Sequence, residues 1–484
     1  MNDTTAHTGA KDINEIFRSG GRSVEFLDHI NKASIVMLAE TGIVPHAVAR
    51  KIAGGIAQVM ASERETPPKR SADYLEYEPL LTDAVGPDAS RLHTGRSRQD
   101  LSSTIARMNL RDGLLRSTDA LANAREKVLE RAADHTETII PAYTHGVQAQ
   151  PTTFAHYLHS LAAALGRQAQ RMREAYARVN VSPLGAAALA TSSFALDRKR
   201  LAFLLGFQGL LENAYDANHL APVDCACEVA AALSIAAIQA GQFAQDIHAQ
   251  YSEPSPWFVL QTGELTGVSS IMPQKRNPAA LEQLRAQASI MLGDMHTVYL
   301  ISHNNRTGMF DYRSYDPVPC ERALQVFRLL RQVVEGIVVD KARALQEVRA
   351  DYSTTTEIAD ALMQRADVPF RIGHHFASKL TDYGRKHGLR LDDIPYAEAV
   401  KMYEAQTGQD FPLSVRDLAE VVSAEYMVFG RKGIGGPQPA EVRRMLEEER
   451  DKLACERVWL MECREHLERA DAALERAFTG LAGS

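Results

Sequence analysis

The sequence predicts a mainly α-helical protein built around a bundle of long helices. Apolar residues recur every three or four positions through long stretches that contain few glycines or prolines. One stretch, residues 224–251, is apolar on nearly every face, as expected for a helix at the centre of a bundle. The others are residues 101–140, 157–179, 278–302 and 319–339. We therefore predict a large antiparallel bundle that is buried further by self-association.

The predicted helices begin at recognisable residues. Asp100 is placed to cap the first long helix, which would extend for about 50 Å at about 1.5 Å per residue. Pro278 occupies the favoured first position of another. The flanking regions have shorter helices and more loops. We predict three domains, at residues 1–97, 98–346 and 347–484, and the last of them ends in a charged helical tail.

Composition excludes several classes of function. The 484 residues carry a net charge of -7, so no basic excess favours nucleic acid as a partner. The five cysteines are odd in number and scattered, which favours a reducing compartment over a disulfide framework. The first residues do not form a signal peptide, and the most apolar stretch, residues 229–244, is too short to span a membrane. We expect a cytoplasmic protein with no membrane partner.

The most informative segment is Gly267-Val-Ser-Ser-Ile-Met-Pro-Gln-Lys-Arg-Asn-Pro278. Ser269 and Ser270 supply hydroxyls, Lys275 a cation and Asn277 an amide, all in one short loop before a helix. This set suits a dicarboxylic acid whose carbon must lose or gain a proton. An exposed serine turn is the structural alternative.

Two further clusters carry polar side chains. His93-Thr-Gly-Arg-Ser-Arg-Gln-Asp100 places arginines and hydroxyls where a helix starts, and both the guanidinium groups and the helix N-terminus attract carboxylates. Thr144-His-Gly-Val-Gln-Ala-Gln-Pro151 contains His145, an imidazole that titrates near neutral pH. Glu282 follows the serine loop and could orient a histidine through its far nitrogen. Capped helix starts and solvated side chains are the structural alternatives for these clusters.

Other motifs are better explained by structural roles than by metal or phosphate binding. Cys225 and Cys227 do not share a helix face, and His374-His375 has no carboxylate or cysteine at ligand spacing. The glycines at 430–436 lack the lysine and hydroxyl that close a phosphate loop. We therefore expect no metal site.

Together these motifs resemble the fumarase/aspartase superfamily, and within it the argininosuccinate lyases. The serine loop is similar to the superfamily signature Gly-Ser-Ser-x-Met-Pro-x-Lys-x-Asn. The segment 93–98 resembles the argininosuccinate-lyase form of the first signature region, and residues 144–151 resemble the second. Ser182-Pro-Leu-Gly and Pro369-Phe-Arg also look like that branch.

The resemblance implies a three-domain helical subunit in a homotetramer, with each active site shared by three subunits. It implies anti elimination of fumarate from an N-substituted succinate without a cofactor. Ser269 would be the general base, Lys275 and Asn277 would stabilise the dianion, and Glu282 would orient His145 on the leaving-group side. The residues expected to bind substrate are Ser97, Arg98, Gln99, Thr144, Gln148, Ser270, Met272 and Asn277.

Departures from the family pattern concern the substrate. Gln99 stands where the family has asparagine, Val268 replaces a loop glycine, and Ala221-Pro-Val-Asp224 lacks an arginine. The segment Asn304-Asn-Arg-Thr-Gly-Met-Phe-Asp-Tyr-Arg-Ser-Tyr315 replaces the one that holds the arginine moiety in argininosuccinate lyases. We therefore expect the fumarate half of the site to be kept and the amine half to be changed.

The expected function is that of a carbon–nitrogen lyase that releases fumarate from an N-substituted L-aspartate, or adds an amine to fumarate in reverse. An ethylenediamine-disuccinate lyase-like enzyme fits this description. Three alternatives stay open: an authentic argininosuccinate lyase, a non-catalytic crystallin-like relative, and a lyase acting on a C–O bond or on adenylosuccinate.

Overall fold

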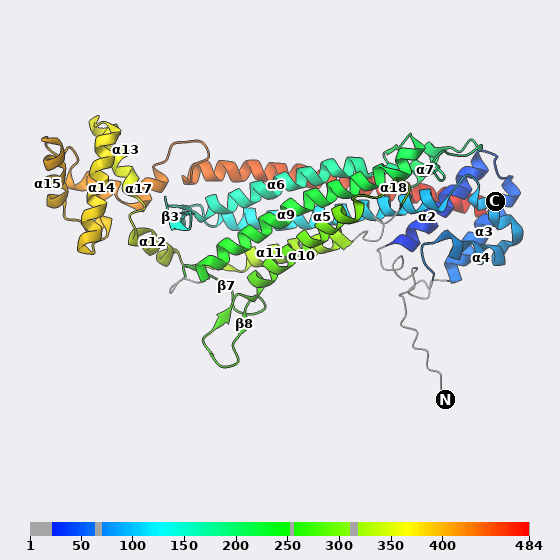
Figure 1. The fold of residues 1–484 in the computed structure, drawn as a ribbon, viewed down its shortest axis with the longest axis horizontal. Helices are drawn as coiled ribbons and strands as arrows, with labels where there is room; N and C mark the ends of the chain where they lie inside the picture. Colours follow the sequence, from blue (N-terminus) through cyan, green and yellow to red (C-terminus); the bar gives the residue numbers. More distant parts are fainter. Residues whose placement is uncertain (1–21, 63–69, 252–255, 310–317, 484) are drawn as a thin grey trace.

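The structure, a computed structural model, describes residues 22–62, 70–251, 256–309 and 318–483. Helices contain 71% of the residues, which confirms the mainly α-helical fold. Figure 1 shows an elongated molecule in which long helices run along the long axis, with shorter helices gathered at each end.

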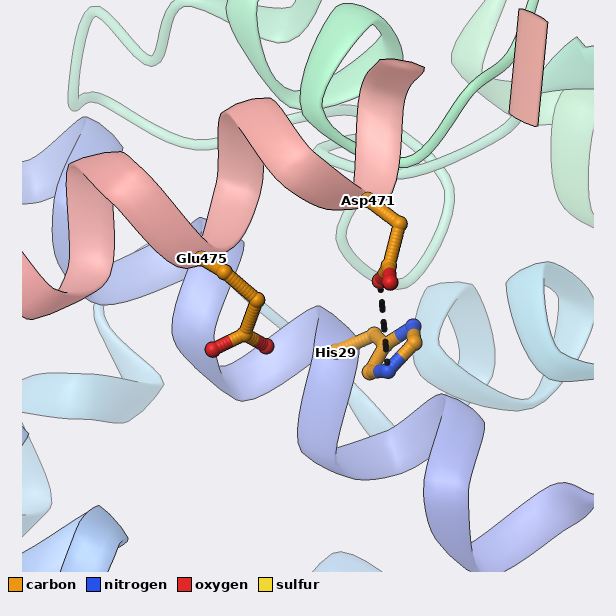
Figure 2. A group of neighbouring side chains, drawn as sticks. All are labelled: His29, Asp471 and Glu475. Atoms are coloured by element: carbon orange, nitrogen blue, oxygen red, sulfur yellow. Dashed lines mark ion pairs between the residues drawn. The ribbon is translucent and has the colours of Figure 1, made fainter. Parts of the chain in front are cut away.

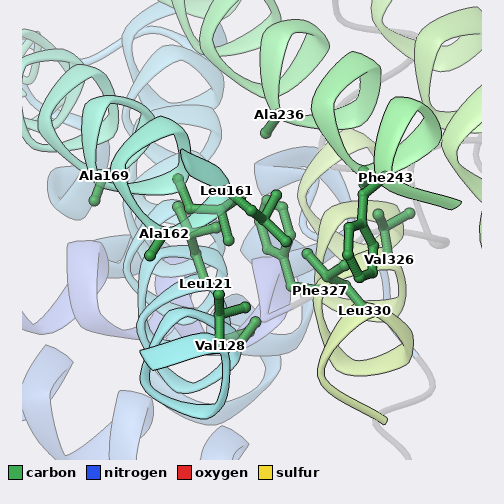
Figure 3. Close-up of a cluster of buried hydrophobic side chains, with 14 of the residues drawn as sticks. Leu121, Val128, Leu161, Ala162, Ala169, Ala236, Phe243, Val326, Phe327 and Leu330 are labelled. Atoms are coloured by element: carbon green, nitrogen blue, oxygen red, sulfur yellow. The ribbon is translucent and has the colours of Figure 1, made fainter. Parts of the chain in front are cut away.

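Long helices make up the central bundle, as the sequence predicts. They are α5 (Arg98–Ala133), α6 (Phe154–Val179), α9 (Ala221–Tyr251), α10 (Ala279–Ser302) and α11 (Val318–Glu335). Helix α5 packs against α6 and α11, while α9 packs against α10 and α6. Their buried apolar side chains interdigitate in one core, which Figure 3 shows around Leu121, Leu161, Phe243 and Phe327.

Four predicted helix boundaries are corrected. The cap of α5 is Ser97 and not Asp100, which lies three residues further on and accepts a hydrogen bond from the Ser97 backbone N–H. The helix ends at Ala133, and a short strand forms at 139–140. Pro278 is the residue before α10 and not its first residue. Helix α11 ends at Glu335, because residues 337–339 pair with another strand.

Short helices at the amino-terminal end pack around their own apolar core. They are α2 (Ser23–Glu40), α3 (His46–Ser62), α4 (Tyr74–Val85), the 3-10 helix η1 (Gly86–His93) and α7 (Arg198–Leu204). This core includes Leu27, Ile56, Leu92 and Leu201, together with Phe478 from the far end of the chain. The start of α5 is thus held against a packed unit.

The opposite end holds a second group of short helices. They are α12 (Lys341–Ala350), α13 (Thr355–Ala366), α14 (Phe370–His387), η3 (Leu391–Asp393), α15 (Tyr396–Thr407), α16 (Val415–Val421) and α17 (Ala424–Phe429). Phe376, Tyr403 and Phe411 contact one another in its core. The last helix, α18 (Pro439–Gly483), then runs back along α5 and α6 to α2 and α3 (Figure 1). The division into three domains stays a prediction.

Short strand pairs pin the connections between helices. The antiparallel pairs are β1 (Ile139–Ile140) with β4 (Thr152–Thr153), β2 (Tyr143–Thr144) with β3 (Val147–Gln148), β7 (Phe258–Leu260) with β10 (Ile337–Val339), and β8 (Gly267–Val268) with β9 (Arg276–Asn277). A parallel pair joins β5 (Val181–Ser182) to β6 (Gly209–Leu210), and α8 (Ala214–His219) precedes α9.

Helix α9 is long and apolar enough to cross a membrane by length and composition, and half of its most apolar window is buried inside the bundle. The core helix of a soluble protein meets the same criterion, so this property alone is weak support for a membrane span. The contacts of α9 with α6, α10 and α11 identify it as a bundle helix.

A buried charge cluster ties α5 to α18. The Arg125 guanidinium lies 2.6 Å from Oε2 of Glu449 and 2.9 Å from Oε2 of Glu456. Gly166 leaves room for it, because a Cβ there would lie 2.8 Å from Nη2. Burial raises the pKa of Glu456 to about 7, although the nearby Arg125 opposes this shift. The arginine therefore neutralises carboxylates that are costly to bury alone.

Replacing Arg125 with methionine should destabilise the protein by about 3–5 kcal/mol, because a buried carboxylate would lose its partner. Chemical unfolding followed by circular dichroism measures the effect. The matched control is Arg116→Met, which removes an exposed pair with Glu321 and should cost less than about 1 kcal/mol. Equal effects of the two substitutions would contradict the prediction.

Candidate functional site

The start of α5 presents the first group of predicted site residues. The Ser97 Oγ accepts a hydrogen bond from the Gln99 N–H at 3.2 Å, and Asp100 accepts one from the Ser97 N–H at 2.8 Å, which forms a capping box. This reciprocal pair fixes the first turn. Ser97, Arg98 and Gln99 therefore stand in sequence at a rigid helix N-terminus, where backbone dipoles favour an anion.

Asp100 anchors that turn to a second segment. Its Oδ2 accepts hydrogen bonds from the backbone N–H groups of Gly185 at 3.0 Å and Ala187 at 3.1 Å. The side chain is fully buried, and burial raises its pKa to about 6, even though the three N–H donors favour the charged form. Asp100 is therefore a positioning residue. It holds the first turn of α5 in place, and its side chain does not reach solvent.

The arginines of this motif have different surroundings. Arg96 is buried, where it donates to Asn31 Oδ1 at 2.9 Å and lies over the Tyr74 ring. Arg98 is more than half exposed and pairs with Asp73, the cap of α4. Of the two arginines, only Arg98 is accessible to a ligand, and it is the one that we expect to bind substrate. The ligand role itself stays a prediction.

The second motif forms a hairpin at the other end of α5. His145 and Gly146 have φ values of 56° and 77° and join β2 to β3, as a two-residue turn with left-handed backbone requires. Thr144 and His145 are exposed. The Gln148 amide nitrogen donates to the Glu347 and Val348 carbonyl oxygens, each at 3.3 Å, so in this chain it anchors the hairpin to the end of α12.

The serine loop is a hairpin that projects from the bundle beside α10 (Figure 1). Gly267 pairs with Asn277 and Val268 with Arg276, so Ser269 and Lys275 are the first residues beyond the paired strands on either side. The Ser269 Oγ accepts hydrogen bonds from the N–H groups of Met272 at 3.1 Å and Ile271 at 3.4 Å. A serine anion at this position would be stabilised by both donors.

The rest of the loop is open to a ligand. Ser270, Met272 and Lys275 are exposed, and Asn277 is half-buried beside Gly267. The Leu265 carbonyl oxygen accepts a hydrogen bond from the Ala280 N–H at 3.1 Å, which ties the base of the hairpin to the first turn of α10. Glu282 lies exposed in that turn.

One chain does not bring these groups together. Helix α5 has 36 residues, so Ser97 and the His145 hairpin are separated by about 54 Å of helix at about 1.5 Å per residue. The serine hairpin projects away from both (Figure 1). Among the described side chains, Glu282 has no hydrogen bond to His145. The orientation of His145 by Glu282 is therefore not seen within a single chain.

The structure adds residues that no sequence motif marked. Asp73 holds Arg98, and Gln99 contacts the Asn218 carbonyl oxygen at 3.4 Å and the His219 Nδ1 at 3.5 Å. Asn218 and His219 end a six-residue helix without a recognisable pattern, so only tertiary structure places them here. Of the departing segment 304–315, residues 310–315 lie outside the described residues.

A histidine and two carboxylates cluster between α2 and α18. His29 on α2 and Asp471 and Glu475 on α18 point toward one another, with ligand atoms within 4.8 Å (Figure 2). The Lys32 ammonium already pairs with Glu475, so a cation occupies this group without any metal. The expectation of no metal site stays a prediction.

Comparison with known proteins identifies the class. A profile of the lyase family matches residues 29–293, and one described as argininosuccinate lyase C-terminal matches residues 352–428. With its long-helix bundle, the chain is a lyase, and it belongs to the argininosuccinate lyase-like family of the fumarase/aspartase superfamily.

Relatives match over nearly the whole length. Argininosuccinate lyase 1 of Shouchella clausii is 31% identical over 459 residues, covering 92% of this chain and 91% of the relative. Argininosuccinate lyase 2 of Agrobacterium fabrum is 33% identical over 484 residues, covering 95% and 93%. The structure of EDDS lyase in complex with formate superposes with a TM-score of 0.88 at 29% identity, covering 100% and 99%. An EDDS lyase variant with bound fumarate gives 0.87 at 29% identity, covering 98% and 97%.

The substitution Asp100→Asn tests the buried carboxylate. Its raised pKa means that the unfolded chain, with an aspartate pKa near about 3.9, ionises first as the pH rises. The stability contributed by Asp100 is therefore present at low pH and is lost as the pH rises through about 6. Asparagine does not titrate, so the variant does not lose stability over this pH range. The difference in the free energy of unfolding between parent and variant should therefore be larger at pH 5 than at pH 8.

Urea unfolding at the two pH values measures the difference, with the exposed Asp134→Asn as control. A destabilisation that is equal at both pH values, or larger at pH 8, would show that Asp100 is not held with a raised pKa.

Proposed function

We propose that this protein is a carbon–nitrogen lyase that reversibly eliminates fumarate from an N-substituted L-aspartate. The Ser269 alkoxide takes the β-proton of the substrate, and the electron pair forms a dianion on the adjacent carboxylate. The Cα–N bond then breaks, fumarate is released, and the departing amine takes up a proton. The substrate and the amine are small molecules, and no cofactor takes part.

The observation that carries this proposal is the environment of Ser269. Its Oγ already accepts hydrogen bonds from two backbone N–H groups, and Lys275 is the first residue beyond the facing strand. A serine hydroxyl is a poor base unless its anion is stabilised. Each positioned donor to an oxyanion contributes about 3–4 kcal/mol, and the N-terminus of α10 lies close behind the hairpin.

The remaining residues have roles that follow from their chemistry. The β-proton is very weakly acidic, so stabilising the dianion by Lys275 and Asn277 contributes most to the rate. Arg98 would bind a carboxylate of the fumarate half, with Ser97, Gln99 and Thr144 completing the grip. Gln148 of the β2–β3 hairpin would line the same site, together with Ser270 and Met272 of the serine loop.

A homotetramer would assemble the separated groups. Helix α9 carries apolar residues on faces that the single chain leaves uncovered, such as Ile238, which is 47% exposed. Ile290 and Leu300 of α10 are exposed as well. Such surfaces favour association. The His145 hairpin of one subunit would then meet Ser269 and Glu282 of another at the Ser97 end of a third.

Authentic argininosuccinate lyase is the second candidate, and two relatives with that name, at 31% and 33% identity, favour it. The segment 304–315 differs from the one that holds the arginine moiety in argininosuccinate lyases, and its described part includes the exposed Arg306. A non-catalytic crystallin-like role is disfavoured by the retention of Ser269, Lys275 and His145. With free cysteines throughout the chain, we also propose a cytoplasmic location.

Replacing Ser269 with alanine should lower fumarate release about 100-fold or more, because the general base is removed. Ultraviolet absorbance of fumarate measures the rate in both directions with a panel of amines and N-substituted aspartates. Ser160→Ala, in an exposed turn of α6, is the matched control. A Ser269→Ala enzyme as active as the parent would refute the mechanism.

Co-expression of two inactive variants tests the shared site. Because Arg98 and Ser269 would come from different subunits at each site, hybrids of Arg98→Ala and Ser269→Ala chains should contain some sites free of either substitution. Activity should therefore exceed the sum of the two parents. Activity equal to that sum in tetramers shown to be mixed would mean that each chain builds its own site.

A further inference from the structure

Arg198, the first residue of α7, donates hydrogen bonds to four backbone carbonyl oxygens in two segments of the chain. In the first segment its Nε donates to Leu184 at 3.0 Å and its Nη2 to Pro183 at 3.4 Å. In the second, its Nη1 donates to Glu212 at 3.0 Å and its Nη2 to Leu211 at 2.8 Å. These segments directly follow the paired strands β5 and β6. Because a guanidinium presents its donors in a fixed planar fork, this one side chain holds both segments in a single relative position.

The residues that follow Leu184 bind the carboxylate of Asp100. Gly185 and Ala187 have φ values of 83° and 52°, both in the left-handed region. Their N–H groups donate to Oδ2 of Asp100 at 3.0 Å and 3.1 Å. Converging backbone N–H groups of this kind form an anion-binding nest. Arg198 therefore fixes the chain immediately before the nest that holds Asp100.

The nest is also held by close packing. A Cβ at Gly185 would lie 2.7 Å from Cγ of Arg198, so the arginine stem lies directly against the nest. Asn218 of α8 donates from its Nδ2 to the carbonyl oxygens of Ala187 at 2.7 Å and Ala188 at 3.1 Å. Side chains from α5, α7 and α8 thus hold this short left-handed segment in place.

Charge provides a second link between Arg198 and Asp100. Burial raises the pKa of Asp100 to about 6, and the Ser97 N–H and the Arg96 charge oppose the rise. Arg198 also interacts electrostatically with Asp100, and Glu212 is a further carboxylate near the guanidinium. A cation favours the ionised carboxylate. Loss of Arg198 should therefore raise the pKa of Asp100 further, through the lost charge and through displaced N–H donors.

We propose that Arg198 is a positioning residue for the site that binds a carboxylate of the substrate. It acts through residues 183–187 on Asp100, and Asp100 fixes the first turn of α5, where Arg98 stands. The proposal rests on the proposed lyase function, because the carboxylate belongs to the substrate of that reaction.

Replacing Arg198 with methionine should raise the KM for fumarate about tenfold in the addition direction, because the groups that bind its carboxylate are displaced. The kcat should change much less, since the Ser269 hairpin is untouched. Arg198→Lys keeps the charge without the fork, so the KM should rise there too. The matched control is Arg200→Met, which removes an arginine of the same helix and its pair with Glu40 and should leave the KM unchanged.

A double-mutant cycle separates positioning from a general loss of stability. If Arg198 acts through Asp100, the combined Asp100→Asn and Arg198→Met enzyme should have a KM little higher than that of the more damaging single variant. Fully multiplicative effects of the two substitutions, or an unchanged KM in a folded Arg198→Met enzyme, would overturn the proposal.

Urea unfolding at several pH values tests the same link without activity. In the parent, the stability contributed by Asp100 is lost as the pH rises through about 6. The loss should extend to higher pH in Arg198→Met, less so in Arg198→Lys, and not at all in Arg200→Met. An identical pH dependence in Arg198→Met and the parent would contradict the action of Arg198 on Asp100. A parent that neither consumes nor releases fumarate would instead refute the lyase function, and the unfolding data would still decide whether Arg198 positions Asp100.

Discussion

The length of α5 is the constraint on which the rest of the site depends. A helix of 36 residues holds its two ends about 54 Å apart, with Ser97, Arg98 and Gln99 at its start and the His145 hairpin beyond its end. The bundle around α5 makes this separation rigid, since α6, α11 and α18 pack along it. A single chain therefore cannot close the site by bending. The same rigidity fixes the first turn of α5, whereas His145 and Ser269 are placed by short strand hairpins that connect the long helices.

Buried polar groups determine the local geometry at the ends of these elements. Asp100 fixes the first turn of α5 against residues 185–187 through backbone N–H groups, and Arg125 fixes α18 against α5 through two carboxylates. Burying either charged side chain is costly unless all of its hydrogen-bond or ion-pair partners are in place. They therefore specify one arrangement of the helices more sharply than apolar packing alone, which tolerates small shifts. Ser97, Arg98 and Gln99 gain their positions from the turn that Asp100 holds.

Much of this architecture could be predicted from the sequence, because the helical period of the long segments is a local property. The type of fold, the long helices and the serine hairpin before α10 follow from such patterns. Helix ends were harder to predict, because both Ser97 and Asp100 suit a cap. Only the backbone shows that Ser97 is the cap. The packing of α18 along α5 is also absent from local pattern, since a charged helix can be solvated or can cover a bundle. His219 belongs to the same class, because its contact with Gln99 spans 120 residues.

The two halves of the proposed site differ in the elements that carry their groups. In the proposed mechanism the groups near Ser269 act on the proton and the carboxylate that every substrate of this reaction would share. They include two backbone N–H groups in a hairpin whose register is fixed by β8 and β9. These two backbone donors do not depend on the identity of the side chains at residues 271 and 272. The side chains of Gln99 and His219 come from α5 and α8, and each can change without altering the hairpin. Under the proposed mechanism, a chain built in this way keeps its bond-breaking chemistry while the side chains that meet the amine can change.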